Sequence, residues 1–137
     1  MRGTQSGQAL VEWALSAFVL LLFALGIIAV GQIVGEDMAV RSAATLAAYA
    51  AARAPSADAA QVAGQRAANE AAQGSQLEDL QVTIDTGGFQ RGGTLTVTAH
   101  AYVNLSAFPI ASQALGRRVP LTWQSHALIE PYRSRTA

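Results

Sequence analysis

The sequence predicts an α+β protein, and three of its features carry that prediction. Helix-favouring residues run from Gln8 to Ala54 without a proline, because the first proline of the chain is Pro55. A second segment rich in alanine follows at residues 57–73. Beyond residue 80 the hydrophobic period shortens from about 3.6 residues to about 2, which indicates β-strands. We therefore expect a long N-terminal helix, a second Ala-rich helix, and a small antiparallel three-stranded β-meander packed on the first helix.

The first part of the long helix has the composition of a membrane span. From Trp13 to Val34 the chain is apolar except for Ser16 and Gln32, and about 20 such residues cross a hydrocarbon core of about 30 Å. A cleaved secretory signal has an apolar region of roughly 7–15 residues before its cleavage site. Here the apolar run continues past the best candidate site at residues 24–26. We therefore expect a retained transmembrane helix at residues 8–35 rather than a removed signal.

The flanking charges predict the orientation of this helix. Arg2 precedes it, and Glu36 and Asp37 follow it. Because positive charge is retained on the cytoplasmic side, we expect a cytoplasmic N-terminus and a single-pass protein of the cell membrane. The C-terminal part, residues 55–137, is then an extracytoplasmic α/β domain.

Nothing in the sequence ends the helix at the membrane. Alanine, the best helix former, dominates residues 36–54, and a residue before proline is driven out of the helical region, so Ala54 is the expected end. Residues 36–54 thus form a juxtamembrane extension that protrudes from the bilayer. We expect the small domain to pack on an apolar stripe of this extension, formed at helical spacing by Met38, Ala39, Ser42, Leu46 and Tyr49.

The second helix has recognisable ends and little core-forming capacity. Ser56 is the expected N-cap, and Gly74 is the expected C-cap. Its large apolar residues are nearly confined to Val62. We therefore expect this helix to cover other elements rather than to form a core.

Three later segments alternate apolar and polar residues, which is typical of half-buried antiparallel strands. The glycine pairs 87–88 and 92–93 bracket the first turn, and Phe108-Pro109 opens the second connection, which has room for a short helix at residues 110–115. Pro120 cannot donate to a strand ladder, so the third strand is expected at an edge. Such a small sheet needs a helix over its apolar face, and the protruding half of the first helix is the candidate. The residues assigned to that face are Leu80, Val82, Ile84, Leu95, Val97, Ala99, Ala101, Val103, Leu105, Val119, Leu121, Trp123, Ala127 and Ile129.

Composition argues against several classes of function. Charged residues make up 13% of the chain, against about 25% in ordinary soluble domains, which favours a membrane or assembly protein. Arg117-Arg118 is the one adjacent basic pair, so no basic groove for nucleic acid is expected. The chain has no cysteine, and His100 and His126, on the polar faces of the second and third strands, lack an evident third ligand. We expect no metal, no cofactor and no catalytic residues, and therefore no enzyme.

Three glycines of the apolar segment are candidates for helix packing. Gly31 and Gly35 form a GxxxG element with Gly26 upstream, and small residues four apart let two helices approach closely in lipid. Glycine is also frequent in membrane helices for other reasons, so both explanations stay open. Trp13 and Tyr49 are candidates for anchors at the membrane interface.

The start of the chain resembles a known family. Gly7-Gln8-Ala9-Leu10-Val11-Glu12, followed by an aromatic residue and a long apolar helix, looks like the N-terminus of a type IV pilin-like protein. Residues 7–15, GQALVEWAL, are similar to the start of TadE-like proteins, the pseudopilins or minor pilins of tight-adherence (Flp) pilus systems. The Ala-rich juxtamembrane helix and the β-rich sequence that ends in HALIEPY extend the similarity along the chain.

This resemblance implies a processing site and an assembly residue. A prepilin peptidase would cut between Gly7 and Gln8, so that residues 1–7 are a leader peptide and Glu12 becomes the fifth residue of the mature chain, followed by Trp13. In pilins this carboxylate is thought to pair with the new amino terminus of its own or a neighbouring subunit. An unmatched charge in low dielectric is penalised, so such a pair can set the register between helices. The alternative explanation places Glu12 at headgroup level, favoured by the positive end of the helix dipole.

The expected function is therefore structural. We expect a TadE-like pseudopilin or minor pilin that is anchored by its apolar helix and acts in the assembly of a tight-adherence pilus, in the membrane or in the pilus itself. The implied partners are the membrane, a prepilin peptidase, other pilin or pseudopilin subunits and the pilus assembly machinery. The alternative is a signal-anchored extracytoplasmic binding module that does not enter a filament. A secreted enzyme with a cleaved signal is a third class, for which no catalytic constellation is evident.

Overall fold

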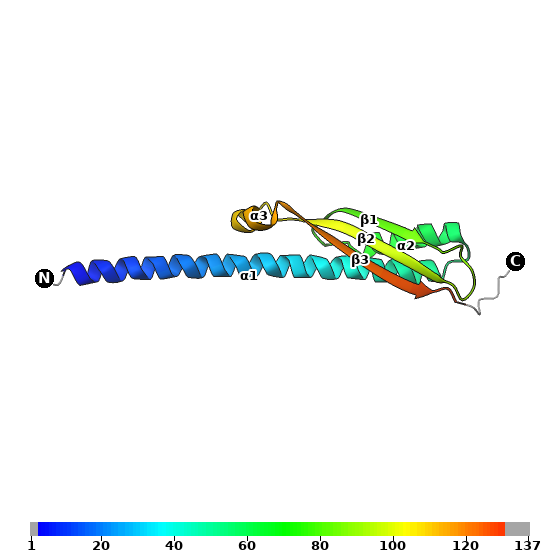
Figure 1. The fold of residues 1–137 in the computed structure, drawn as a ribbon, viewed down its shortest axis with the longest axis horizontal. Helices are drawn as coiled ribbons and strands as arrows, with labels where there is room; N and C mark the ends of the chain where they lie inside the picture. Colours follow the sequence, from blue (N-terminus) through cyan, green and yellow to red (C-terminus); the bar gives the residue numbers. More distant parts are fainter. Residues whose placement is uncertain (1–2, 131–137) are drawn as a thin grey trace.

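The computed structural model describes residues 3–130 and confirms the predicted α+β class. The elements follow in the order α1 (Gly3–Ala52), α2 (Ala57–Ala71), β1 (Leu77–Asp85), β2 (Thr94–Asn104), α3 (Pro109–Leu115) and β3 (Arg118–Leu128) (Figure 1). The orientation prediction from Arg2, the first two residues of the predicted leader and residues 131–137 of the predicted domain lie outside the described residues.

Helix α1 is a single rod of 50 residues, which corresponds to about 75 Å at 1.5 Å per residue. It includes the end of the predicted leader, since it begins at Gly3 rather than at Gln8. It ends at Ala52, two residues before the predicted Ala54. The last turn closes through a hydrogen bond from the Ala54 amide to the Ala51 carbonyl oxygen, 3.1 Å, ahead of the constraint that Pro55 imposes.

Helix α2 begins as predicted and ends earlier than predicted. The Ser56 hydroxyl accepts a hydrogen bond from the Ala59 amide, 3.2 Å, and Ser56 is the N-cap. The prediction of Gly74 as the C-cap was wrong, because Ala72 occupies that position. Gly74 lies in the following turn at φ +80°, a backbone conformation that glycine adopts without strain. The turn leads directly into β1.

The three strands form the predicted meander in the order β1-β2-β3 with antiparallel pairing throughout. Strand β3 lies at an edge, which confirms the placement predicted from Pro120. Strand β1 begins at Leu77, three residues earlier than the alternating pattern indicates. The cause is a bulge between Glu78 and Gln81, where Asp79 has a φ of +52°. A bulge inserts an extra residue and breaks the alternation on which the prediction depends.

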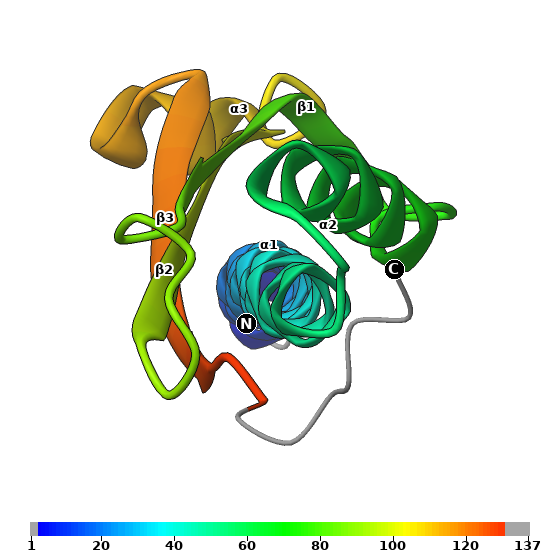
Figure 2. The ribbon, with the colours of Figure 1, turned by 90° about the vertical axis from the view of Figure 1, so that its right-hand side faces the viewer.

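The sheet curls around the C-terminal half of α1, and α2 packs against α1 and β1 (Figure 2). The predicted covering of the sheet by the protruding half of α1 is therefore confirmed. The central strand supplies the buried face of the sheet, with every second residue from Leu95 to Val103 buried. The face of α1 that meets the sheet and α2 is almost entirely alanine and is buried: Val40, Ala43, Ala44, Ala47, Ala48, Ala51 and Ala52.

The prediction that Met38, Ser42, Leu46 and Tyr49 form the packing face of α1 was wrong, since all four side chains are exposed. The fifth residue of that stripe, Ala39, is half-buried. Alanine side chains let the helix axis approach the sheet and α2 closely, whereas the larger side chains would hold them apart. The large side chains of Met38, Leu46 and Tyr49 therefore point away from the domain.

Two contacts fix α2 against the edge of the sheet. A Cβ on Gly64 would lie 2.2 Å from Ile84 Cδ1 and 3.4 Å from the Ala47 carbonyl oxygen, so a side chain at this position would force the end of the Ile84 side chain to move. The side-chain amides of Gln61 and Gln65 donate to the carbonyl oxygens of Ile84 and Val82, at 2.7 and 2.6 Å. These bonds use acceptors on strand β1, which reduces the tendency of that edge to pair with another chain.

Candidate functional site

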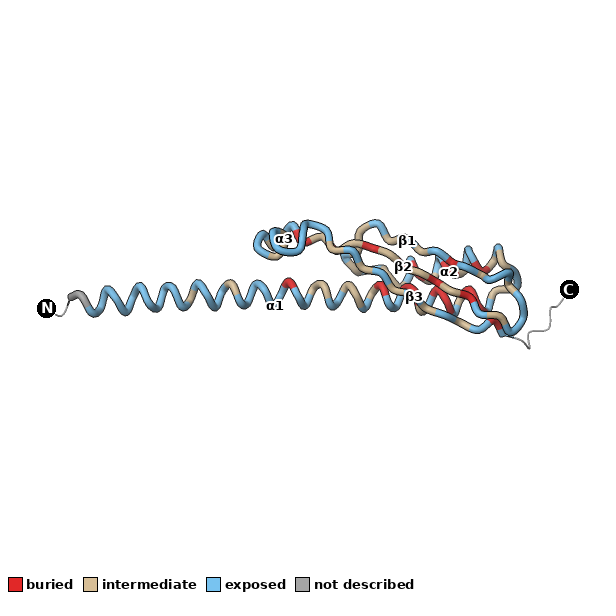
Figure 3. Tube along the Cα trace, viewed as in Figure 1, coloured by how far each residue is buried: buried red, intermediate tan, exposed pale blue. Residues whose placement is uncertain are grey.

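Helix α1 consists of two halves that differ in their surroundings (Figure 3). In the bare half, residues 5–28, every side chain is exposed except for the half-buried Ala17 and Leu22. The covered half, residues 29–52, carries the alanine face. The most apolar window of α1 has a mean hydropathy of 2.7 and is 6% buried, whereas a core helix of a soluble protein is mostly buried. Helix α1 thus has the length and composition to cross a membrane, a test that a signal sequence near the N-terminus also passes.

The predicted processing and assembly residues lie together at the start of the bare half. Gly7, Gln8, Glu12 and Trp13 are all helical and exposed, and Trp13 is 72% exposed. Gln8 and Glu12 are four residues apart, so they share one face of the helix at a separation of about 6 Å along the axis. Glu12 has no ion-pair partner among residues 3–130. The structure therefore leaves its carboxylate available to a group outside the described chain.

Two of the three candidate packing glycines share a face of α1. Gly31 and Gly35 are one turn apart, while Gly26, nine residues before Gly35, lies on the opposite side at about 100° per residue. A Cβ at any of the three would meet nothing within 4 Å. Inside the described chain these glycines therefore serve no close contact, and any close approach at them involves another molecule.

The face of Gly31 and Gly35 continues onto the covered half of α1. Spacings of three and four residues connect these glycines with bulky residues that point away from the domain. Met38 is 63% exposed, Leu46 is 50% exposed and Tyr49 is 57% exposed. We call this surface the back stripe, and its residues are Gly31, Gly35, Met38, Ser42, Leu46 and Tyr49. Tyr49 lies about 20 Å beyond Glu36 along the axis, so it belongs to this stripe rather than to the boundary marked by Glu36.

A polar contact joins the domain to α1 where the two halves meet. Gln32 Nε2 donates to Gln76 Oε1, 3.0 Å, and the Gln76 backbone amide donates to Glu36 Oε1, 3.0 Å. The other carboxylate oxygen of Glu36 is buried without a hydrogen-bond partner among the described residues. Sequence reasoning did not find this contact. Its one signal was Gln32, a polar residue inside an apolar run.

The root of the β2–β3 connection is held by a second polar cluster. Arg118 pairs with Glu78 at 3.3 Å and with Asp79, and its guanidinium lies 4.3 Å from the centre of the Tyr102 ring. The hydrogen bond to Asp79 is the main cause that raises the pKa of Arg118 above its ordinary value. The bulge in β1 brings both carboxylates to this one arginine. Arg118 therefore fixes the end of the sheet from which α3 projects.

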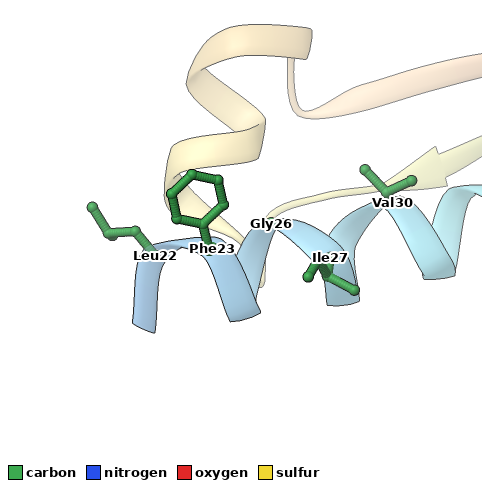
Figure 4. A pocket seen from close by; sticks show the side chains of 5 residues that line it. All are labelled: Leu22, Phe23, Gly26, Ile27 and Val30. Atoms are coloured by element: carbon green, nitrogen blue, oxygen red, sulfur yellow. The ribbon is translucent and has the colours of Figure 1, made fainter. Parts of the chain in front are cut away.

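A shallow apolar groove of about 480 Å³ runs along α1 from the bare half to the start of the covered half. Its lining consists of Leu22, Phe23, Gly26, Ile27 and Val30 (Figure 4). The Phe23 side chain points to the side on which α3 lies (Figure 4). The lining residues carry no side chain suited to acid–base chemistry, so the groove is suited to contact with apolar groups.

Each of the two histidines forms a hydrogen bond with a threonine of the neighbouring strand. His126 Nδ1 lies 3.0 Å from Thr96 Oγ1, and His100 Nδ1 lies 2.6 Å from Thr122 Oγ1. The strand register separates the two histidines by four residue positions, about 13 Å. Residues 3–130 contain no group of three or more His, Cys, Asp or Glu side chains that could hold a metal ion.

Trp123 lies on the inner face of the sheet, as its strand parity predicts, and is half-buried against the cluster of Val40 and Ala44. The Arg41 guanidinium covers its ring at 4.1 Å from the centroid, and Arg41 also pairs with Asp37 at 2.9 Å. These groups lie just beyond the polar contact of Gln32 and Glu36.

No protein-family model, curated protein or solved structure matches this chain.

Proposed function

We propose that this protein is a TadE-like pseudopilin or minor pilin of a tight-adherence pilus system. In this role, α1 inserts the subunit in the membrane and then packs against helices of other subunits. The observation that carries the proposal is the back stripe, an exposed face that begins with Gly31 and Gly35 and continues to Tyr49. A helix that served only as a membrane anchor would not need such a face on its protruding half.

The division of α1 supports this role physically. The bare half presents large aliphatic and aromatic side chains on all sides, as a helix in lipid does. Because packing between helices in lipid depends on close approach, the open backbone at Gly31 and Gly35 suits a helical partner. The covered half keeps its alanine face for its own domain, so the two packing faces do not compete.

We assign to Glu12 the role of setting the register between neighbouring subunits. After cleavage between Gly7 and Gln8, a new α-amino group would lie one helical turn from the Glu12 carboxylate. Moving a charged group out of water is favourable only when an opposite charge pairs with it. A subunit docked out of register would leave Glu12 unpaired and would therefore be disfavoured. Gly7 favours access to the Gly7–Gln8 bond, because glycine in a helix is less stable than alanine by about 1 kcal/mol. Local unwinding of the first turns would expose the bond to a peptidase.

The intact mass of the protein extracted from membranes of its producing cells tests this proposal. A chain that begins at Gln8 supports processing by a prepilin peptidase. A chain that retains Met1 supports the alternative, a signal-anchored extracytoplasmic binding module, and a chain that begins near Ile27 supports a secreted protein. Replacement of Gly7 by a bulky residue, Gly7→Leu, is the matched control and should abolish the shorter form.

A further inference from the structure

The connection between β2 and β3 points toward the bare half of α1, and its composition is unusual for a surface loop. We call residues 105–117, LSAFPIASQALGR, the arm; it contains α3. It carries no charged residue from Leu105 to Gly116. Ile110 is 60% exposed and Leu115 is 57% exposed. An exposed loop that is free of charge and rich in apolar residues needs an explanation beyond solubility.

The level of the arm along α1 follows from the strand register. Gln76 contacts Gln32 and Glu36, and β1 starts at the next residue. Leu77 pairs with Val103, and Asn104 pairs with Arg118. The end of the sheet therefore lies beside Gln32 and Glu36, and the arm extends from there toward the N-terminal half of α1. Figure 4 shows α3 level with the labelled groove residues, and Figure 1 shows α3 beside the middle of α1. In Figure 2, α3 lies to one side of α1 and at a distance from it.

We propose that the arm docks in the outer leaflet of the membrane that α1 crosses, with Ile110 and Leu115 among the acyl chains next to the headgroups. This inference depends on the anchoring that the proposed function assigns to α1. Interfacial helices bury their apolar face about 5–10 Å below the headgroups. From Gln32, that depth corresponds to roughly three to seven residues of α1, the level of the groove residues Gly26 and Ile27.

The chemistry of the arm fits a lipid interface better than the bilayer centre. The Ser112 hydroxyl is satisfied by the Pro109 carbonyl oxygen at 2.9 Å, and the exposed Gln113 side chain can reach water at headgroup level. Arg117 is exposed and makes no ion pair within residues 3–130, so it is available to lipid phosphates. Arg118, by contrast, is held by Glu78 and Asp79. The apolar groove, which only α1 residues line, offers acyl chains a surface on the helix at the level of the arm.

The lack of cysteine allows a direct test with the full-length protein. Single variants Ile110→Cys, Leu115→Cys, Leu20→Cys and Val62→Cys would carry an environment-sensitive fluorophore in vesicles of phosphatidylcholine and phosphatidylglycerol. All four positions are exposed, so the labels should not disturb the core, and circular dichroism checks this. The quenchers are lipids with a nitroxide near the headgroup or near the end of the acyl chain.

We expect the shallow nitroxide to quench the labels at 110 and 115 strongly, the deep nitroxide to quench the label at 20, and neither to quench the label at 62. A label at 110 that remains as accessible to water as the label at 62, while the label at 20 is quenched, would overturn the proposal and leave the anchor intact. A label at 20 that no lipid quenches would overturn the anchor and the arm together. Shielding at 110 that depends on protein concentration and not on lipid quenchers would identify a second copy as the occupant and overturn the proposal as well.

Discussion

The two halves of α1 are both apolar and helical, yet they differ in the size of their side chains. The bare half carries leucine, isoleucine, valine and phenylalanine, most of them more than half exposed. The covered half meets its own domain through alanines that are almost completely buried. In lipid, large side chains gain contact with acyl chains on every side. Against a sheet and a second helix, small side chains gain more, because they allow close approach of whole elements.

This difference shows that hydrophobicity alone does not identify the face on which a helix packs. On the covered half the buried face consists of alanines and Val40, whereas the large side chains of Met38, Leu46 and Tyr49 point outward. They lie in line with Gly31 and Gly35 of the GxxxG element, and together they form the back stripe. One helix thus has a face for its own domain and a face that its own domain leaves open.

The largest expected effect concerns the start of the bare half. Replacement of the carboxylate in Glu12→Ala should leave the protein in the membrane fraction and abolish its incorporation into filaments, because the register between subunits would be lost. Immunoblots of membranes and of sheared filaments measure the two properties. Glu12→Asp, which retains the charge, should restore part of the incorporation. Normal incorporation of the alanine variant would show that Glu12 only marks the headgroup level.

A change of side-chain size on the buried face of the covered half should have the next largest effect, a loss of folding stability. Ala47→Leu places a larger side chain on the buried face, and overpacking of this kind costs about 1–3 kcal/mol. The neighbouring Leu46→Ala removes a half-exposed side chain and should change the free energy of unfolding by less than about 0.5 kcal/mol. Urea unfolding of the detergent-solubilised protein, followed by circular dichroism, compares them. Equal destabilisation by both variants would contradict the assignment of the two faces.

The smallest expected effect lies at the junction between the halves. Glu36→Ala removes the acceptor of the Gln76 amide, and the loss of this charge-assisted bond at a partly exposed site should cost about 1 kcal/mol. The matched control Asp37→Ala breaks the exposed pair with Arg41, which should cost about 0.3–0.5 kcal/mol. The same unfolding experiment applies. A larger loss of stability in the control than in Glu36→Ala would contradict the role of Glu36 in the contact between domain and helix.

Much of the fold could be predicted from the sequence, because it depends on local pattern. The uninterrupted helix, the Ser56 cap, the three alternating strands, the short helix after Phe108 and the edge position of the Pro120 strand all follow from residue types and their spacing. The packing face of α1 could not, since a period of 3.6 identifies bulky stripes and not alanine faces. The early start of β1 depends on the bulge at Asp79, which alternation hides.

The site shows the same limit. The glycines, Glu12 and the Gly7–Gln8 bond were found from short motifs, and their roles stay predictions. The contact of Gln32 and Glu36 with Gln76, the pairing of Arg118 with two carboxylates, and the level of the arm all join residues about 40 or more positions apart. Such contacts depend on how the sheet is placed along α1, which no local pattern specifies.

Cysteine cross-linking along the back stripe tests the central claim most directly. In cells that assemble filaments, Leu46→Cys should form cross-links with helices of other subunits. The control Val62→Cys, at a position on α2 that is more exposed than Leu46, should remain monomeric. Glu12→Ala combined with Leu46→Cys should lose the cross-link. A Leu46→Cys protein that stays monomeric in membranes and filaments, or one that cross-links no better than Val62→Cys, would contradict the account of α1 as an assembly helix.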